Sequence, residues 1–95
     1  MKIPKTILMG GHEVMVEKVG NDDINAAGDW SAWCQRIRIN DEGAPEDRQA
    51  ETFLHEMLEA IKYFSGIKLP HAQLTIISEM LFATIRQNKL TFLKD

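Results

Sequence analysis

The segment His55-Glu56-Met57-Leu58-Glu59 contains the residues best suited to chemistry in this 95-residue chain. His55 and Glu59 are four positions apart, so on a helix they lie within about 40° of each other and one turn apart. Two such side chains can bind one metal ion from a single rigid helix. Glu56, about 100° away from His55, would lie beside the ion and could take a proton from a water molecule that attacks a carbonyl. The pattern predicts a metal-dependent hydrolase in which Glu56 is the catalytic base.

The pattern is H-E-x-x-E, whereas zinc peptidases of this type carry H-E-x-x-H. A carboxylate is an accepted zinc ligand, but its charge makes the ion less Lewis-acidic than a second imidazole would. Harder ions such as manganese are therefore an alternative to zinc.

A zinc hydrolase usually needs a third protein ligand and leaves one position for water. The downstream segment offers His71 and Glu79, which are eight residues apart and so about 12 Å apart along a helix, too far to bind the same ion. If a tight turn near residues 66–68 joins two helices, Glu79 lies level with His55 and His71 lies near the tip of the hairpin. We therefore predict His55, Glu59 and Glu79 as metal ligands, with His71 as the alternative.

Two segments carry a resemblance to a known family. Residues 52–61, Thr-Phe-Leu-His-Glu-Met-Leu-Glu-Ala-Ile, resemble the H-E-x-x-H-A-I helix of very small phage and prophage proteins related to zincin-like, ImmA/IrrE-type metallopeptidases. Residues 78–85, Ser-Glu-Met-Leu-Phe-Ala-Thr-Ile, resemble the downstream helix of that family, whose glutamate completes the metal site. The resemblance implies a minimal zincin-like domain that acts on a peptide or protein, with His55 and Glu79 as ligands and Glu56 as base. Glu59 departs from the second histidine of the superfamily, although an H-E-x-x-E-A form looks like a variant among the phage proteins.

A second interpretation involves no catalysis. His55 and Glu59 fall almost opposite the apolar arc of their helix, where solvated polar pairs are common. On this interpretation the site is degenerate and binds no metal, and the chain is a phage accessory or interaction protein on the same scaffold. A homodimer through exposed Phe82, Phe92 or Trp30 is a third hypothesis.

The first half of the chain is predicted to form strands. Residues 7–9 and 14–16 flank Gly10-Gly11, a pair suited to the positive φ angles of a two-residue hairpin turn. Residues 20–28 are polar and turn-rich, which predicts a loop. Residues 33–39 alternate in polarity and are predicted to form the third strand. The two tryptophans, Trp30 and Trp33, are expected to pack in the core or over the sheet.

The second half is predicted to form two helices. The first runs from Pro45 to about Phe64 and the second from Pro70 to about Gln87 or Asn88, and their short connection makes them antiparallel neighbours. The predicted fold is α+β, with a three-stranded antiparallel sheet packed on this helix pair. Residues 90–93 are compatible with a short strand or with a continuation of the helix. The second helix is expected to bury an apolar stripe that consists of Leu74, Ile76, Ile77, Met80, Leu81, Ala83 and Ile85.

Composition and charge indicate the general class of the protein and exclude some classes of partner. The chain is long enough for one domain, residues 1–95, and its apolar share of 44% and charged share of 26% are typical of globular proteins. The net charge is −3 and the basic residues are scattered, which argues against nucleic acid as a partner. The sequence has no run near the ~20 apolar residues that span a bilayer, no export signal, and one cysteine, Cys34, so we expect a cytoplasmic protein that does not bind membranes.

Overall fold

The N-terminal part of the chain folds into the predicted hairpin. In the computed structural model, which describes residues 2–90, β1 (Thr6–Met9) and β2 (His12–Val19) pair antiparallel, with Met9 opposite His12. The turn is Gly10-Gly11, and φ is 58° at the first glycine and 82° at the second. Glycine adopts these angles without the steric cost that a Cβ atom would add, so the pair fixes the register of the hairpin.

The fold is α+β, as predicted, but the sheet differs from the predicted three-stranded antiparallel one: it has four strands and is mixed, because one of its three pairings is parallel. A second hairpin consists of β3 (Gly28–Ser31) and β4 (Arg36–Asn40), and the strand order is β1-β2-β4-β3. β4 inserts between β2 and β3 and runs parallel to β2. The sequence did not reveal β3 because it begins with Gly28-Asp29, two residue types that are depleted in strands, and pairing with β4 overrides that local preference.

The third predicted strand begins too early. Residues 32–35 form the turn between β3 and β4, and Trp33 within it is 96% exposed, so its predicted packing is wrong. Trp30, on β3, is partly buried against the core, as expected.

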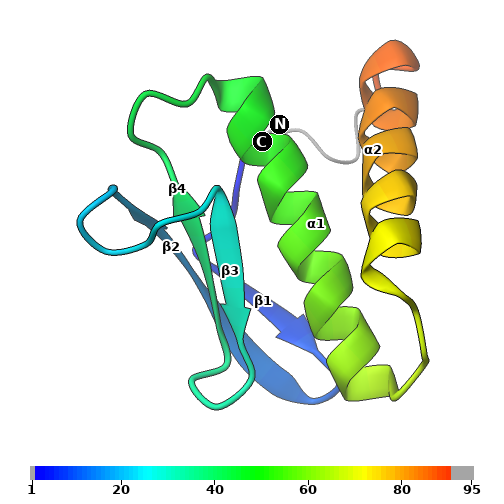
Figure 1. Cartoon of the computed structure of the whole chain (residues 1–95). Helices are drawn as coiled ribbons and strands as arrows, with labels where there is room; N and C mark the ends of the chain where they lie inside the picture. Colours follow the sequence, from blue (N-terminus) through cyan, green and yellow to red (C-terminus); the bar gives the residue numbers. More distant parts are fainter. Residues whose placement is uncertain (1, 91–95) are drawn as a thin grey trace.

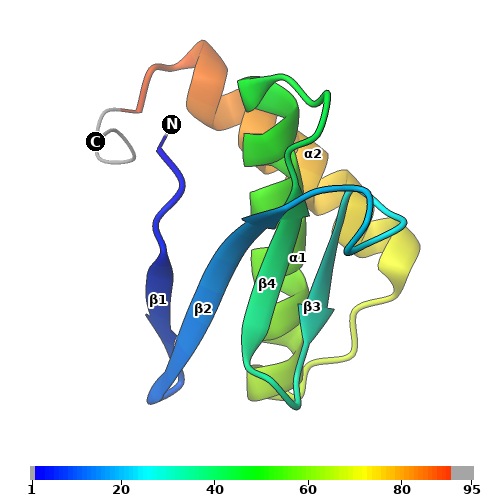
Figure 2. The same ribbon diagram turned by 90° about the vertical axis from the view of Figure 1, so that its left-hand side faces the viewer.

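Both predicted helices are present, to within about one residue at each end. Helix α1 spans Glu46–Ser65 and lies across one face of the sheet, while α2 spans His71–Gln87 and packs on the side of α1 that faces away from the sheet (Figure 1). Figure 2, seen from the sheet side, shows both helices behind the strands. The domain therefore has three layers, with its core between the sheet and α1. That core contains Val14, Val16, Ile37, Ile39 and Phe53.

Among the described residues, helix α2 packs mainly against α1, so its apolar stripe is buried only in part. Leu74 and Ile85 are buried as predicted, and Ser78 is buried with them against α1. Four other apolar residues that were expected to be buried are exposed, because no other element within residues 2–90 covers them; these are Ile76, Ile77, Met80 and Leu81.

No helix within residues 2–90 combines the length and the apolar character needed to cross a bilayer. The prediction for residues 90–93 falls, beyond Leu90, outside the described part of the chain, and so does Phe92.

Candidate metal centre

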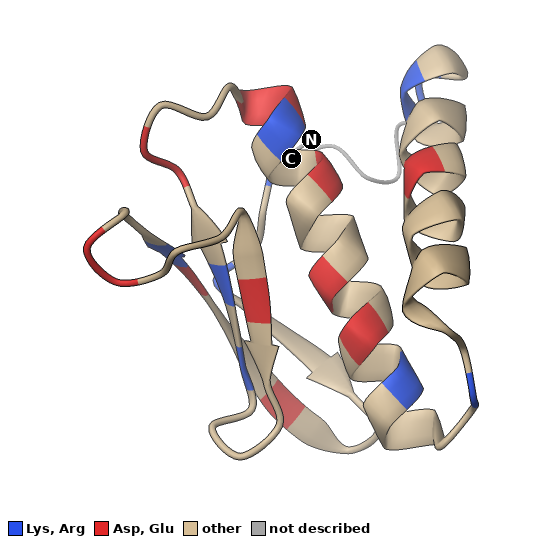
Figure 3. Ribbon diagram, viewed as in Figure 1, with Lys and Arg blue, Asp and Glu red and all other residues tan. Residues whose placement is uncertain are grey.

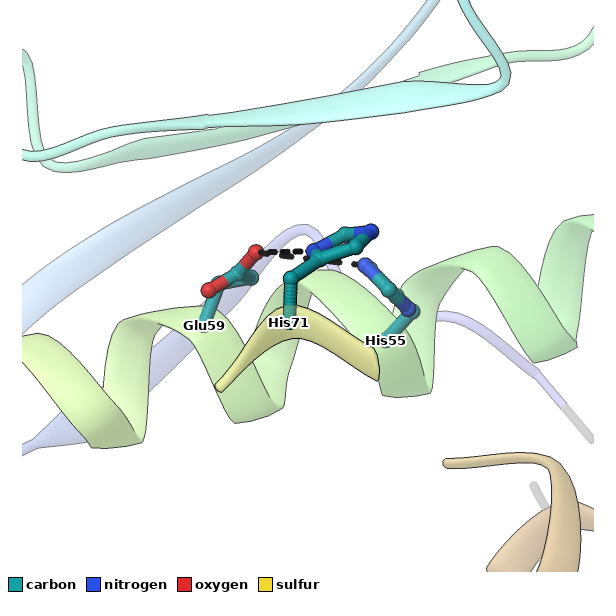
Figure 4. A group of neighbouring side chains, drawn as sticks. All are labelled: His55, Glu59 and His71. Atoms are coloured by element: carbon teal, nitrogen blue, oxygen red, sulfur yellow. Dashed lines mark ion pairs between the residues drawn. The ribbon is translucent and has the colours of Figure 1, made fainter. Parts of the chain in front are cut away.

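Two histidines and a glutamate come together where α2 begins beside α1 (Figure 4). Glu59 Oε2 lies 3.4 Å from His71 Nδ1 and 3.9 Å from His55 Nε2, and the two imidazole centroids are 5.2 Å apart. One potential ligand atom from each of the three residues lies within 4.8 Å of the others. In a tetrahedral zinc site with bonds of about 2.0–2.2 Å, ligand atoms are roughly 3.3–3.6 Å apart. Small side-chain rotations would therefore bring this group to the spacing that one ion requires.

The link between the helices explains why His71 belongs to the group. Residues 66–70 run back along α1 before α2 begins (Figure 1), so the connection is not the tight turn on which the sequence argument relied. Extended residues advance over 3 Å each, compared with 1.5 Å in a helix, so five of them move the start of α2 well back from the end of α1. His71, the first residue of α2, consequently contacts Glu59 and does not lie apart from it at the hairpin tip, as was predicted.

Glu79, the predicted third ligand, is exposed and is not part of this group. Glu79 and His71 are both on α2, eight residues and so about 12 Å apart along its axis, which is too far for the two to bind one ion. Of the predicted ligands, the structure brings His55 and Glu59 together, and the alternative, His71, takes the third place.

His55 and Glu59 are partly screened from solvent, whereas 71% of the His71 side chain is exposed, and the screening affects the protonation of His55. Burial lowers the pKa of His55 below its ordinary value of 6.5, although neighbouring Glu59 acts in the opposite direction. A histidine with a lowered pKa is neutral at pH 7, which is the form that binds metal. Lys62, whose Nζ lies 3.9 Å from Glu59 Oε1, supplies a positive charge on the other side of the carboxylate.

Glu56, the predicted base, is buried against the sheet. Its side chain packs where β3 approaches α1: a Cβ atom added at Gly28 would lie 3.4 Å from Glu56 Cγ and 2.6 Å from Thr52 Cγ2. Only 8% of Glu56 is exposed, and this burial, followed by the charges of Glu59 and Asp29, raises its pKa to about 7. A carboxyl group with a pKa near the working pH is well suited to general base catalysis.

Two residues of β3 that shape the surroundings of Glu56 were not predicted from the sequence. Gly28 allows the close approach of β3 to α1, and Asp29 contributes to the raised pKa of Glu56. Asp29 is itself held by Arg38 of β4 in a two-pronged ion pair, in which Nε donates to Oδ1 at 3.0 Å and the second nitrogen donates to Oδ2. The only available signal was the Gly-Asp pair, which indicates a turn as readily as a strand.

Comparison of the chain with protein-family models, curated proteins and solved structures finds no match. The resemblance of its helices to ImmA/IrrE-type metallopeptidases therefore stays a prediction.

Proposed function

We propose that the chain is a metal-dependent hydrolase that acts on peptide or protein substrates, with one zinc ion bound by His55, Glu59 and His71. The observation that carries the proposal is the position of His71. A histidine and a glutamate four residues apart on a helix are commonplace, but a second histidine that converges on them from another helix is not required by helix periodicity. The set of two imidazoles and one carboxylate is one that catalytic zinc sites use.

The chemistry of the donor atoms favours zinc over manganese. Two imidazole nitrogens suit zinc, whereas manganese prefers oxygen-rich sites. Three protein ligands leave a coordination position for water or substrate, as in catalytic zinc sites. A zinc ion there would polarise a substrate carbonyl and lower the pKa of bound water.

Glu56 is the group of this chain that would move the proton. With a pKa of about 7, Glu56 is ionised in a substantial fraction of the molecules at neutral pH, and in that form it can accept a proton from the attacking water. The same carboxyl group can then return that proton to the leaving amine, so one residue serves as base and as acid. The resemblance noted in the sequence supports a phage or prophage protein, and the lack of an export signal in the sequence supports a cytoplasmic one; both attributes belong to the same proposal.

One observation favours a non-enzymatic alternative. Glu59 lies close to three basic side chains, those of His55, Lys62 and His71, so the group could simply tie α2 to α1 as an ion-pair network. On that alternative the chain is an accessory or interaction protein, and the group should bind zinc no better than an exposed cluster does.

Calorimetric titration of chelator-treated protein with zinc and with manganese separates the two functions. We expect one zinc per chain, with at least about tenfold weaker binding in His55→Ala, Glu59→Gln and His71→Ala, since each removes one of three ligands. Glu79→Gln is the matched control and should bind zinc as the wild type does. Glu56→Gln should bind zinc normally and fail to cleave a peptide library. Failure of the folded wild-type protein to take up either metal would overturn the proposal.

A further inference from the structure

The outward face of α2 is apolar and uncovered within the described chain. Its four large side chains are substantially exposed: Ile76 by 59%, Met80 by 62%, Ile77 by 44% and Leu81 by 37%. Monomeric soluble proteins rarely leave a contiguous apolar patch of this kind without a use for it. The exposed polar residues Gln73 and Thr84 lie at the two ends of the patch.

These six residues, which we call the outer stripe, form one continuous face. At about 100° per residue they cover roughly 140° of the helix circumference, on a face centred about 110° from the buried side formed by Leu74, Ser78 and Ile85. The outer stripe contains no charged residue. The charged residues of α2 nearest to it in sequence, Glu79 and Arg86, project from a different side, and Figure 3 shows how sparsely α2 is charged compared with α1. The six residues are Gln73, Ile76, Ile77, Met80, Leu81 and Thr84.

The outer stripe is complementary to a reversed copy of itself. If a two-fold axis passes between Ser78 and Glu79, perpendicular to α2, each residue of the stripe faces another residue of the stripe on the second copy. The facing pairs are Gln73 with Thr84, Ile76 with Leu81, and Ile77 with Met80. The apolar centre then meets an apolar centre. At each end, a glutamine amide can donate to a threonine hydroxyl whose own hydrogen is already bonded to the Met80 carbonyl at 2.8 Å.

We propose that two copies of this chain pair through α2, antiparallel, about this two-fold axis. Symmetric dimers use the same patch on both partners, and a patch that matches its own reverse meets that requirement. The residues Gln73, Ile77, Met80 and Thr84 are spaced by four, three and four positions, which is the spacing of helix pairs that cross at about 20°.

Other partners fit the outer stripe less well. A helix that lies on a lipid surface carries lysines and arginines beside its apolar face, and α2 has one basic residue between Ala72 and Gln87, Arg86, which is bound to Asp47 at 3.2 Å. An unrelated protein partner would not require the stripe to match its own reverse. The metal-ligand group lies on another side of α2, at His71, so pairing leaves it open and this proposal is independent of the proposed function.

The affinity of the proposed dimer can be judged from the size of its interface. The stripe is about 16 Å long, so the interface is smaller than the ~1,200–2,000 Å² of stable complexes. We therefore expect a dimer that forms and dissociates with concentration.

Sedimentation equilibrium from about 5 µM to about 500 µM, a range that brackets micromolar dissociation constants, tests the proposal. The wild type should approach twice the 10.8 kDa chain mass as concentration rises. Met80→Lys should dissociate at least about tenfold more readily, because each dimer would bury two unpaired charges. Ile67→Lys, which changes an apolar residue that is 52% exposed outside the stripe, is the matched control and should dimerise as the wild type does. A wild type that stays monomeric, or a Met80→Lys variant that dimerises normally, overturns the proposal.

Cysteine cross-linking tests the antiparallel direction. In a Cys34→Ser background, Gln73→Cys mixed with Thr84→Cys should form a disulfide-linked dimer under mild oxidation. Gln73→Cys alone should not, because its two copies would lie roughly 16 Å apart along the axis, beyond the reach of a disulfide. Cross-linking of Gln73→Cys alone would mean a parallel pair and would overturn the proposed geometry.

Discussion

Replacing Glu56 with glutamine separates the energetic cost of burying this carboxyl group from its use as a base. Burial raises its pKa from 4.5 to about 7, so the folded protein holds the proton more tightly than the unfolded chain does. Below pH 4.5 the group is protonated in both states and costs little. Above pH 7 it is ionised in both states, and the folded state must bury a charge. Glu56 therefore lowers the free energy of unfolding progressively as pH rises through this window.

The size of the effect follows from the shift. At 1.36 kcal/mol per pKa unit, the cost at alkaline pH is roughly 3 kcal/mol, and the remaining exposure of the side chain makes this an upper limit. Glutamine has nearly the same shape and carries no charge, so Glu56→Gln should stabilise the metal-free protein by up to about 3 kcal/mol at pH 8 relative to wild type, and hardly at all at pH 4.

Urea unfolding in the presence of a chelator at several pH values measures this difference directly. Titrating groups that do not interact with Glu56 contribute equally in both proteins and cancel when the curves are subtracted, which leaves Glu56 and its coupling to Glu59 and Asp29. Glu79→Gln, which alters an exposed carboxyl group, should follow the wild-type profile throughout. Parallel pH profiles for Glu56→Gln and wild type would refute the reasoning, since they would mean that the Glu56 carboxylate is not buried at a cost.

Two further changes test the packing that positions the site. Gly28→Ala should destabilise the domain by about 1–3 kcal/mol, because the new Cβ would lie 2.6 Å from Thr52 Cγ2 and 2.9 Å from the Arg38 carbonyl oxygen. Adding Thr52→Ser should recover part of this loss in thermal unfolding, since it removes the first contact and leaves the second; no recovery would argue against the Thr52 contact. Ile37→Ala should cost about 2–5 kcal/mol, because Ile37 is fully buried, whereas Leu8→Ala, at a position 82% exposed, should cost little; similar losses for both in urea unfolding would contradict the assigned core.

The parts of the fold that the sequence predicted are those encoded by local signals. Gly10-Gly11 defines the first hairpin, and the prolines before Glu46 and His71 coincide with the starts of the two helices. The position of β4 between β2 and β3 is not encoded locally, because it depends on pairing between segments about twenty residues apart. The polar residues between these segments carry no signal of that pairing. Strand pairing of this kind is decided by the whole sheet, not by the propensity of a segment.

The candidate site likewise has a part that local spacing predicts and a part that depends on the tertiary structure. The relation between His55, Glu56 and Glu59 follows from helix geometry, so spacing alone was sufficient to predict it. The third member depends on where α2 begins relative to α1, which is set by the path of residues 66–70. A chain segment of five residues can span very different distances as a turn or as an extended link, so spacing could not choose between His71 and Glu79.

The environment of Glu56 bears on whether the ligand group is functional or merely structural. An ion-pair network that ties α2 to α1 needs Glu59 and its basic neighbours, but it gives no reason for a carboxyl group to be buried next to His55 in sequence, against β3. A leucine or alanine at position 56 would fill that space without the cost of burying a charge. Local choices that oppose stability tend to occur where a protein needs them for function, and a carboxyl group whose pKa is raised to about 7 beside a set of potential metal ligands is one such choice. The unfolding profile of Glu56→Gln therefore tests the premise on which the catalytic interpretation depends, and it does so without knowledge of the substrate.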